Sequence, residues 1–332
     1  MHRTDWLKEA KWGVFHHFLA DTAVYRAFMP DEVWNDLRAT VGRPDFVFKL
    51  RADFGMSLTV RDWNKYVDNF DVAALAKQLE ELNAGYYFIT IGQNSGFYCS
   101  PSRTYDEIVG INPSKCSERD LISDLHKALT PKGIKLMVYL PSGAPHYDEA
   151  AKEALEWQKG DFRNSEFQVK WESIIREWSE RWGDKVAGWW FDGCYHADAM
   201  YRHESPPNFA SFAAAARSCN SNSLISFNPG VLDPIITMTE HEDYTAGEMD
   251  TPLNVQCPGR WIEQAQCQML SYLSCWWYWT DRMRFTGEQV IDVTKRIVSK
   301  GGVVTWDTYF EPNGHIPEEP FNQLHAISKS VK

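Results

Sequence analysis

The sequence lacks the features of nucleic-acid-binding, membrane-spanning and exported chains. Its 332 residues contain 34 Lys and Arg against 45 Asp and Glu, a net charge of -11, and no basic run forms a patch of opposite sign. We therefore expect no nucleic-acid partner. The N-terminus has no apolar segment of signal-peptide length, and no apolar stretch approaches the roughly 20 residues that span a bilayer. We expect a cytoplasmic protein without a membrane partner, and periplasmic export or secretion stays open for a chain whose signal peptide was removed.

Metal and nucleotide motifs are also missing. The seven cysteines form no CxxC pair and no zinc-type spacing. They are Cys99, Cys116, Cys194, Cys219, Cys257, Cys267 and Cys275. His16 and His17 are adjacent on a predicted strand and therefore point to opposite faces, while His196 and His203 lack a partner at ligand spacing. Since no GxGxxG or GxxxxGK(S/T) sequence is present either, we expect free thiols, no metal and no cofactor.

The order of hydrophobic patterns predicts an α/β fold, a single (β/α)8 barrel of the TIM type. Short apolar runs alternate with amphipathic helical stretches, as in successive βα units. The predicted strands are Trp12–Leu19, Tyr86–Ile91, Lys135–Leu140, Ala187–Phe191, Leu224–Phe227, Tyr244–Glu248, Ser274–Trp279 and Val303–Trp306. The predicted helices are Val72–Leu82, Glu118–Leu129, Ser165–Trp182, Asn208–Ser218, Arg260–Leu273, Gly287–Ser299 and Glu319–Lys329. Because 332 residues leave too little for a second domain, residues 1–332 are predicted to form one catalytic domain.

Two further features point to the carboxyl-terminal face of this barrel, where barrel active sites are built. The connection between the first strand and Val72 has about fifty residues, more than an ordinary connection needs, and we expect it to cover that face. The chain also has 15 Trp, several of them near predicted strand ends. Most of these indoles fit core packing, but indole faces also stack on sugar rings, so a carbohydrate site is the second interpretation.

The segment Gly188–Gly193 is the most informative in the chain. It is an apolar strand that ends in Asp192, followed by glycine. At the end of a barrel strand, such a carboxylate points into the mouth of the active site. Asp-Gly is also an ordinary turn dipeptide, and spacing alone leaves the two interpretations equal.

Four segments in the right order resemble the α-L-fucosidase family, family 29 of the glycoside hydrolases. Trp6–His17 is similar to the family's WFKEAKFGIFIHWG, and Phe70–Tyr87 is similar to its FDA...W...L..AGAKY pattern. Trp190–Gly193 matches its WFDG strand. Val298–Val304 followed by Pro312–Ile316 resembles its VSKNGNLLLNIGP..DG.I. The resemblance covers nearly the whole chain.

The resemblance implies a retaining mechanism with two carboxylates, one a nucleophile and one an acid/base. Asp192 occupies the position of the nucleophile. For the acid/base, Glu248 is best placed at the end of a predicted strand, and Glu240 and Glu242 remain alternatives. The resemblance also implies substrate-binding roles, which fall on His17, Tyr139 and Trp190.

The departures from the family pattern bear on the sugar. The family's paired histidines in HHDGF are replaced by Gln93 and Asn94, amides that both donate and accept hydrogen bonds, so the hydroxyl pattern of the preferred sugar need not be that of fucose. Where the family has LLLNIGP, this chain carries a further carboxylate, Asp307. Trp279 and Arg282 are further candidate substrate contacts at the barrel mouth, together with Arg284. The two arginines also fit solvated loop positions; if they line the mouth instead, they favour a carboxylated or sulfated sugar. The family's C-terminal β-sandwich is expected to be absent.

Three functions are therefore compared. The first is a retaining exo-glycosidase that acts on a terminal sugar of an oligosaccharide or glycoconjugate. The second is a cofactor-free lyase or dehydratase for an acidic or sulfated sugar, and the third is a catalytically silent carbohydrate-binding barrel. Asp192 argues against the third, since a binding protein needs no nucleophile. A carbohydrate is the expected partner in each case, and the sequence leaves a homo-oligomer open.

Overall fold

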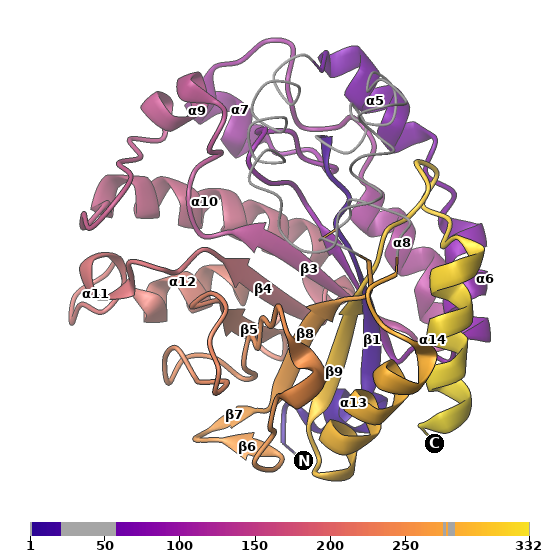
Figure 1. Ribbon diagram of the computed structural model, residues 1–332. Coiled ribbons are helices and arrows are strands. Elements are labelled where there is room, and N and C mark those ends of the chain that lie inside the picture. Colours follow the sequence, from indigo (N-terminus) through magenta and orange to yellow (C-terminus); the bar gives the residue numbers. More distant parts are fainter. Residues whose placement is uncertain (1, 21–57, 275–276, 278–282, 332) are drawn as a thin grey trace.

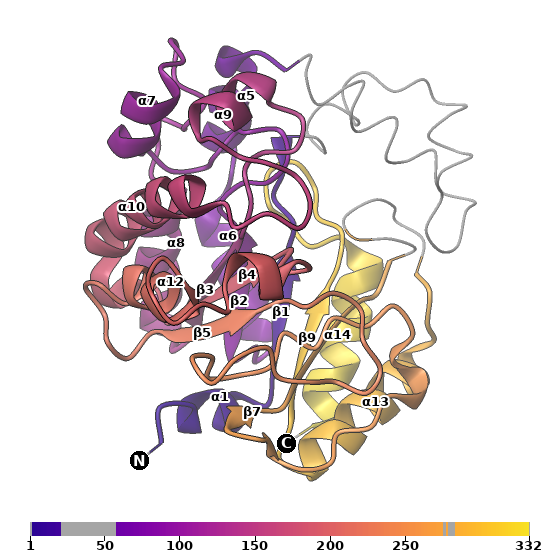
Figure 2. The ribbon, with the colours of Figure 1, turned by 90° about the vertical axis from the view of Figure 1, so that its left-hand side faces the viewer.

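Seven parallel strands form the central sheet of the computed structural model, which describes residues 2–20, 58–274, 277 and 283–331 (Figure 1). The strands are β1 Trp12–His16, β2 Tyr86–Thr90, β3 Lys135–Pro141, β4 Gly188–Asp192, β5 Leu224–Phe227, β8 Gln268–Tyr272 and β9 Val303–Asp307. Their order is β5-β4-β3-β2-β1-β9-β8, and every neighbouring pair is parallel. The sheet curls, with helices packed outside it (Figures 1 and 2). The predicted (β/α)8 barrel class is confirmed.

The eighth position of the barrel, between β5 and β8, is occupied by the segment 243–249. Single parallel bridges join Tyr244 to Gln266 and Glu248 to Leu270, and the N–H of Asp243 donates to Ile225 O at 2.8 Å. The predicted strand Tyr244–Glu248 thus lies where it was expected, although its pairing is interrupted. Gly247 explains the interruption: its φ is +59°, and a Cβ there would lie 1.9 Å from Gln268 O.

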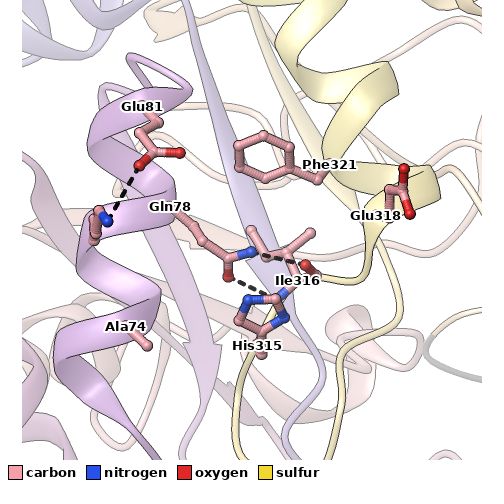
Figure 3. A pocket seen from close by; sticks show the side chains of 8 residues that line it. Ala74, Gln78, Glu81, His315, Ile316, Glu318 and Phe321 are labelled. Carbon is pink, nitrogen blue, oxygen red and sulfur yellow. Dashed lines mark hydrogen bonds and ion pairs between the residues drawn. The ribbon is translucent and has the colours of Figure 1, made fainter.

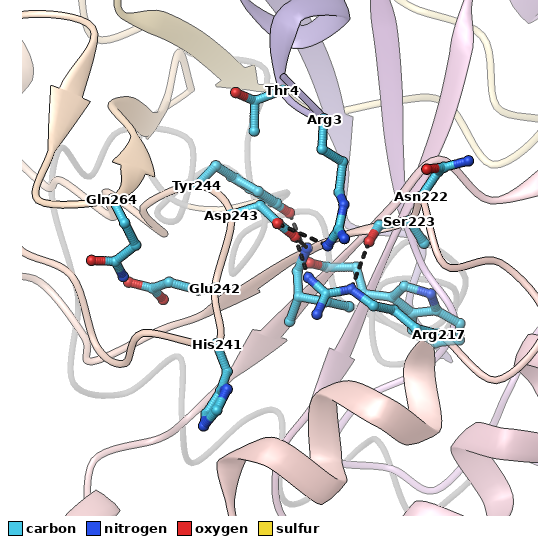
Figure 4. Close-up of polar contacts among 12 residues, drawn as sticks. Arg3, Thr4, Arg217, Asn222, Ser223, His241, Glu242, Asp243, Tyr244 and Gln264 are labelled. Atoms are coloured by element: carbon cyan, nitrogen blue, oxygen red, sulfur yellow. Dashed lines mark hydrogen bonds and ion pairs between the residues drawn. The ribbon is translucent and has the colours of Figure 1, made fainter. Parts of the chain in front are cut away.

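An ionic cluster ties this eighth segment to the chain's N-terminus and to the helical layer. The carboxylate of Asp243 lies between two arginines, Arg3 at 3.1 Å and Arg217, and it also accepts a bond from the N–H of Ile225 at 2.8 Å (Figure 4). Both oxygens of this largely buried carboxylate are therefore satisfied. Such a carboxylate can fix the register of the segment that carries Glu248.

The helices surround the sheet. They are α1 Asp5–Ala10, α5 Val60–Asp68, α6 Val72–Glu81, α7 Arg103–Val109, α8 Leu121–Leu129, α9 Glu149–Ala154, α10 Ser165–Trp182, α11 Ala197–Met200, α12 Phe209–Ala216, α13 Gly287–Ser299 and α14 Glu318–Ser330. Short 3-10 turns are η1 Thr130–Lys132, η2 Gly183–Lys185 and η3 Pro252–Asn254. Side-chain caps fix several starts; Asn208 and Thr286 each form a capping box with the residue three positions on. No helix in the described part of the chain is both long and apolar enough to cross a membrane.

The helix predicted around β8 was wrong. The predicted helix Arg260–Leu273 is instead a small hairpin, β6 Trp261–Ile262 and β7 Ala265–Gln266, followed by β8. The strand predicted at Ser274–Trp279 lies largely outside the described residues, and β8 is the strand that neighbours β9 in the sheet. The physical reason is burial: all of β8 is buried, and a parallel strand buried on both faces lacks the alternation that distinguishes a strand from a helix.

The barrel interior is filled by large side chains. Phe15, Phe88, Met137, Tyr139 and Trp190 belong to this inner cluster, while a larger cluster lies between the sheet and the helices. The ring of Tyr86 also enters the barrel, and it fits only because position 13 is glycine: a Cβ at Gly13 would lie 2.3 Å from that ring. The barrel is therefore a packed core, and ligands are left to its mouth.

The segment around Ile316, which resembles the last of the family's motifs, packs against helix α6 on the outside of the barrel. The side-chain amide of Gln78 on α6 donates to Ile316 O and accepts from Ile316 N, both at 2.8 Å (Figure 3). This pair fixes the turn before α14 against α6. Gln78 and Ile316 form one wall of a cavity of about 440 Å³, which His315, Glu318 and Phe321 also line.

Candidate active site

Polar side chains from five successive strand ends form one hydrogen-bonded chain. Gln93, which follows β2, donates from Nε2 to the hydroxyl of Tyr139 at 2.6 Å, and that hydroxyl donates to Asp192 Oδ2 at 2.6 Å. Asn228, which follows β5, donates from Nδ2 to Asp192 Oδ1 at 2.8 Å and to Glu248 Oε2 at 2.6 Å. The structure thus brings four predicted site residues together at the carboxyl-terminal face.

Asn228 is the residue that the sequence did not reveal. Its side chain is fully buried, and its Oδ1 accepts a bond from the N–H of Gly230 at 3.0 Å. That bond fixes the amide so that its NH2 group faces the two carboxylates. In the sequence, Asn228-Pro229-Gly230 has the composition of an ordinary turn. The only available signal was its position directly after a predicted strand.

The hydroxyl of Tyr139 is a hydrogen-bond donor to Asp192. The residue is 1% exposed. Burial, and then the negative charge of Asp192, raise the pKa of its hydroxyl well above the ordinary value. A phenol that keeps its proton can donate to Asp192 while it accepts from Gln93. The two oxygens of Asp192 therefore each receive a bond from a neutral donor.

His17 and Asp307 form a second group beside this chain. His17 Nδ1 lies 2.7 Å from Asp307 Oδ2, and both side chains are buried. The imidazole ring lies 5.6 Å from the ring of Tyr139 and 5.5 Å from that of Trp277. Such a carboxylate fixes the orientation of the imidazole. His17 and Asp307 were predicted separately, and the structure shows that they are paired.

Trp190 lies deeper than its predicted role suggests. Its indole is 3% exposed, stacks on Tyr139 with centroids 5.3 Å apart, and donates from Nε1 to Ala246 O at 3.3 Å. In the described structure, Trp190 therefore supports Tyr139. A direct contact between Trp190 and a sugar stays a prediction.

The three candidate acid/base residues lie in different environments. Glu248 shares Asn228 with Asp192. Glu240 is exposed and lies 3.6 Å from His241. Glu242 is 3% exposed, and it accepts bonds from the N–H groups of Met238 and Phe227 at 2.6 and 3.3 Å. Figure 4 shows Glu242 on the segment leading into the eighth barrel position. Of the three, only Glu248 is joined to Asp192 through a hydrogen-bonded residue.

A cavity of about 640 Å³ adjoins Asp192. Gln93, Asn94, Tyr139 and Asp192 line it, and the backbone of Asn94 also accepts a bond from the N–H of Tyr147 at 2.8 Å. The remaining wall comes from Pro141, Gly143, Ala144, His146, Tyr147, Trp157, Lys159, Gly160, Gly193, Tyr195, His196 and Met200. Both amides that replace the family's histidines therefore face the same space as Asp192.

Some predicted contacts are placed elsewhere or lie outside the described residues. Trp279 and Arg282 are outside them, as is the part of the long connection that covers residues 21–57. Arg284 donates to Asp250 O at 2.5 Å, and its guanidinium lies 4.0 Å from the centre of the Tyr272 ring. Within the ranges that the structure describes, no three His, Cys, Asp or Glu side chains are grouped to hold a metal ion.

A parallel barrel with two carboxylates joined by one amide, beside a cavity that polar and aromatic side chains line, has the features of a glycoside hydrolase. The family model for alpha-L-fucosidase matches residues 1–332, so the chain belongs to the α-L-fucosidase family. It is accordingly a glycoside hydrolase with a carbohydrate substrate. Comparison with curated protein sequences gives no significant match.

Solved structures agree with this fold at low sequence identity. A bacterial fucosidase bound to a monovalent iminocyclitol inhibitor superposes with a TM-score of 0.65 and 16% identity, over 99% of this chain and 74% of that one. The α-L-fucosidase from Lactobacillus casei, in complex with α-L-fucose product, superposes with a TM-score of 0.65 and 15% identity. The match covers 98% of this chain and 97% of that one. An endo-fucoidan hydrolase from glycoside hydrolase family 107 superposes with a TM-score of 0.69 and 14% identity. The match covers 98% of this chain but 53% of the hydrolase.

Proposed function

We propose that the protein is a retaining glycosidase of the α-L-fucosidase type, with Asp192 as nucleophile and Glu248 as acid/base. The observation that carries the proposal is the shared donor. Because Asn228 Nδ2 is bonded to both carboxylates, Asp192 Oδ1 and Glu248 Oε2 are at most about 5.4 Å apart, the two bond lengths laid end to end. Retaining enzymes hold their carboxyl groups about 5–5.5 Å apart, whereas inverting enzymes need roughly 6.5–9.5 Å for an intervening water.

The proposed reaction has two steps. In the first, a carboxylate oxygen of Asp192 attacks the anomeric carbon while Glu248 gives its proton to the glycosidic oxygen, and the bond between carbon and that oxygen breaks. In the second, the Glu248 carboxylate takes a proton from water, and the resulting hydroxide displaces Asp192 from the same carbon. Two inversions give net retention.

The surroundings of Asp192 suit this task. An ionised carboxylate only accepts hydrogen bonds, and Asp192 meets one donor at each oxygen, Tyr139 at Oδ2 and Asn228 at Oδ1. Each oxygen keeps a second lone pair for attack. The neighbouring pair of His17 and Asp307 supplies groups that can bind sugar hydroxyls. Fixed donors and acceptors of this kind orient the anomeric carbon toward the nucleophile.

The specificity of the site is part of the proposal. Amides at Gln93 and Asn94 stand where the family pattern has imidazoles, and one amide hydrogen of Gln93 is already given to Tyr139. We expect fucose or a closely related deoxy or hydroxylated sugar at a terminal position. Its preferred hydroxyl pattern depends on what the two amides can still accept and donate.

One experiment tests the mechanism. The protein is incubated with 4-nitrophenyl α-L-fucoside, and proton NMR follows which anomer of the free sugar is released first. The α-anomer as first product supports retention, and initial release of the β-anomer would refute it. Labelling with 2-deoxy-2-fluoro-α-L-fucosyl fluoride, followed by peptide mapping, should place the covalent adduct on Asp192. Asp192→Asn should lose about a thousandfold or more in kcat and remain folded, while Glu240→Gln serves as the control.

A further inference from the structure

The cavity beside Asp192 is larger than the catalytic groups require. Its volume of about 640 Å³ lies in the range of sites that enclose ligands larger than a single sugar ring. Gln93, Tyr139 and Asp192 come from strand ends, whereas most of the other wall residues come from the loops that follow β3 and β4. We call the part of the cavity lined by these loops the outer cavity.

One wall of the outer cavity is a loop, residues 156–164, between α9 and α10 (Figure 1). Asn164 is 9% exposed, and its side chain accepts from the N–H of Gln158 at 2.8 Å and donates to the carbonyl of Gln158 at 2.9 Å. Arg163 donates to the carbonyls of Met200 at 2.6 Å and Pro207 at 2.5 Å. These bonds fix the loop both to itself and to the segment after α11, so the residues it presents to the cavity are held in place.

Trp157 gives this wall an apolar surface. Its indole packs closely on Gly143, where an added Cβ would lie 2.9 Å from the indole ring. The ring of Phe167 packs edge-on against the indole, with the two ring centroids 4.6 Å apart. An immobilised indole that lines a cavity is a surface on which the apolar face of a sugar can pack. The outer cavity therefore combines a fixed aromatic side chain with polar groups.

Of the two cations in the loop, Arg163 donates to backbone carbonyls, and Lys159 is the one that lines the cavity. The acidic neighbours are paired: Glu156 with Lys170 at 2.7 Å, and Asp161 with His196 at 2.6 Å. Lys159 lines the cavity and has no ion-pair partner within the described part of the chain. In a chain with a net charge of -11, an exposed lysine that lines the same cavity as Asp192 favours an anionic ligand group.

We propose that the outer cavity is the subsite for the leaving-group sugar, and that Lys159 selects a substrate with an anionic substituent, a sulfate or a carboxylate, on that sugar. This inference rests on the proposed function, since Asp192 defines where the cleaved bond lies. The substrate class is therefore an acidic oligosaccharide, and the sugar bound at Asp192 itself need carry no charge. Trp157 packs on the ring while the lysine pairs with the substituent.

The kinetic test compares three aryl α-L-fucosides: the 4-nitrophenyl compound and its analogues with a carboxylate or a sulfonate at position 3 of the ring. The three substrates differ in leaving-group reactivity, but this difference is the same for every variant. It therefore cancels when the variants are compared by one ratio, kcat/KM for a charged substrate divided by kcat/KM for the neutral one. This ratio should fall roughly threefold to tenfold in Lys159→Gln, the scale of one partly exposed ion pair, and further in Lys159→Glu. Lys127→Gln, which removes an exposed lysine of α8, should leave it unchanged. Equal ratios in wild type and both Lys159 variants would overturn the proposal.

A binding test separates this proposal from the proposed function. If the wild type cleaves none of the fucosides, the fucosidase assignment fails, and the subsite is then judged by calorimetry. The probes are a sulfated fucan oligosaccharide and its desulfated counterpart, titrated into Asp192→Asn with and without Lys159→Gln. Tighter binding of the sulfated probe, lost with Lys159→Gln, supports the subsite. Equal affinity for the two probes, or binding of neither, refutes it.

Discussion

Asp192 and Glu248 share a single hydrogen-bond donor, the side-chain nitrogen of Asn228, at 2.8 and 2.6 Å. Asn228→Ala removes both bonds and leaves two neighbouring carboxyl groups without the group that spaces them. We expect kcat to fall about a hundredfold, near the lower end for loss of a preorganised donor in an active site. Steady-state kinetics on the best aryl glycoside measures the loss.

Asn228→Asp sharpens that test, because it places a third carboxyl group against the other two. Like charges in contact disfavour ionisation, so the acidic limb of the pH profile of kcat/KM should move to higher pH. Asn222→Ala, at an exposed position of the same region, is the control. An unshifted profile in Asn228→Asp together with normal turnover in Asn228→Ala would contradict the role given to Asn228.

Tyr139→Phe should damage catalysis more than stability. It removes the donor to Asp192 Oδ2 and the hydroxyl that accepts from Gln93 Nε2, while the ring keeps its packing on Trp190. We expect kcat to fall at least tenfold. The matched control is Tyr244→Phe, whose hydroxyl is buried and donates to Trp189 O at 2.8 Å. It should cost about 1 kcal/mol of unfolding free energy with little change in kcat. Equal kinetic effects in both variants would argue against a specific role for Tyr139.

The sequence predicted most of the barrel because burial and periodicity agree over most of its length. β5 and α10 have their predicted bounds, and α13 does as well. Element starts were less secure: the helix predicted from Glu118 begins at Leu121, because Asp120 caps it. Ser117, directly before the predicted start, is also of a residue type that caps helices, so only the fold decides between the two.

What failed had a physical cause in each case. β8 was assigned to a helix because a strand buried on both faces has no period of two. Asn228 was missed because its function depends on two carboxylates 36 and 20 residues away in sequence. The pairing of His17 with Asp307 spans 290 residues and is visible only once β1 and β9 are neighbours. Asp192 was predicted because it ends a strand that the pattern had located, whereas Tyr139 was predicted from the family resemblance.

Gly247→Ala should open the barrel locally. The left-handed backbone at Gly247 is unfavourable for alanine, and the added Cβ would meet the carbonyl oxygen of Gln268 at 1.9 Å. We expect a loss of several kcal/mol in unfolding free energy, measured by urea denaturation, and a loss of activity because Glu248 follows directly. Gly259→Ala is the control, since a Cβ there meets nothing within 4 Å. Equal stability of the two variants would show that the eighth segment tolerates a different backbone.

Cys257 and Cys267 should couple under oxidising conditions. Their sulfurs lie 2.7 Å apart and both side chains are buried. Oxidised glutathione would accept the two electrons, so that two thiols become one disulfide and two molecules of reduced glutathione are released. Peptide mapping without reductant should find the linked pair, and Cys257→Ser should abolish it. The exposed Cys219 should instead form a mixed disulfide with glutathione. Mixed disulfides at Cys257 and Cys267 in place of the cross-link would contradict this prediction.

Glu242 should make stability depend on pH. Burial raises the pKa of its carboxyl to about 8 from an ordinary value of 4.5. Between these values the folded protein keeps a proton that the unfolded chain releases, so the contribution of Glu242 is complete below pH 4.5 and is lost as the pH rises through 8. Each pKa unit corresponds to about 1.4 kcal/mol, so the decline amounts to a few kcal/mol. Urea denaturation at pH 5 and pH 9 should show a smaller difference in Glu242→Gln than in the wild type, whereas Glu240→Gln should keep the wild-type difference. An unchanged difference in Glu242→Gln would mean that the buried carboxyl is already ionised in the folded protein.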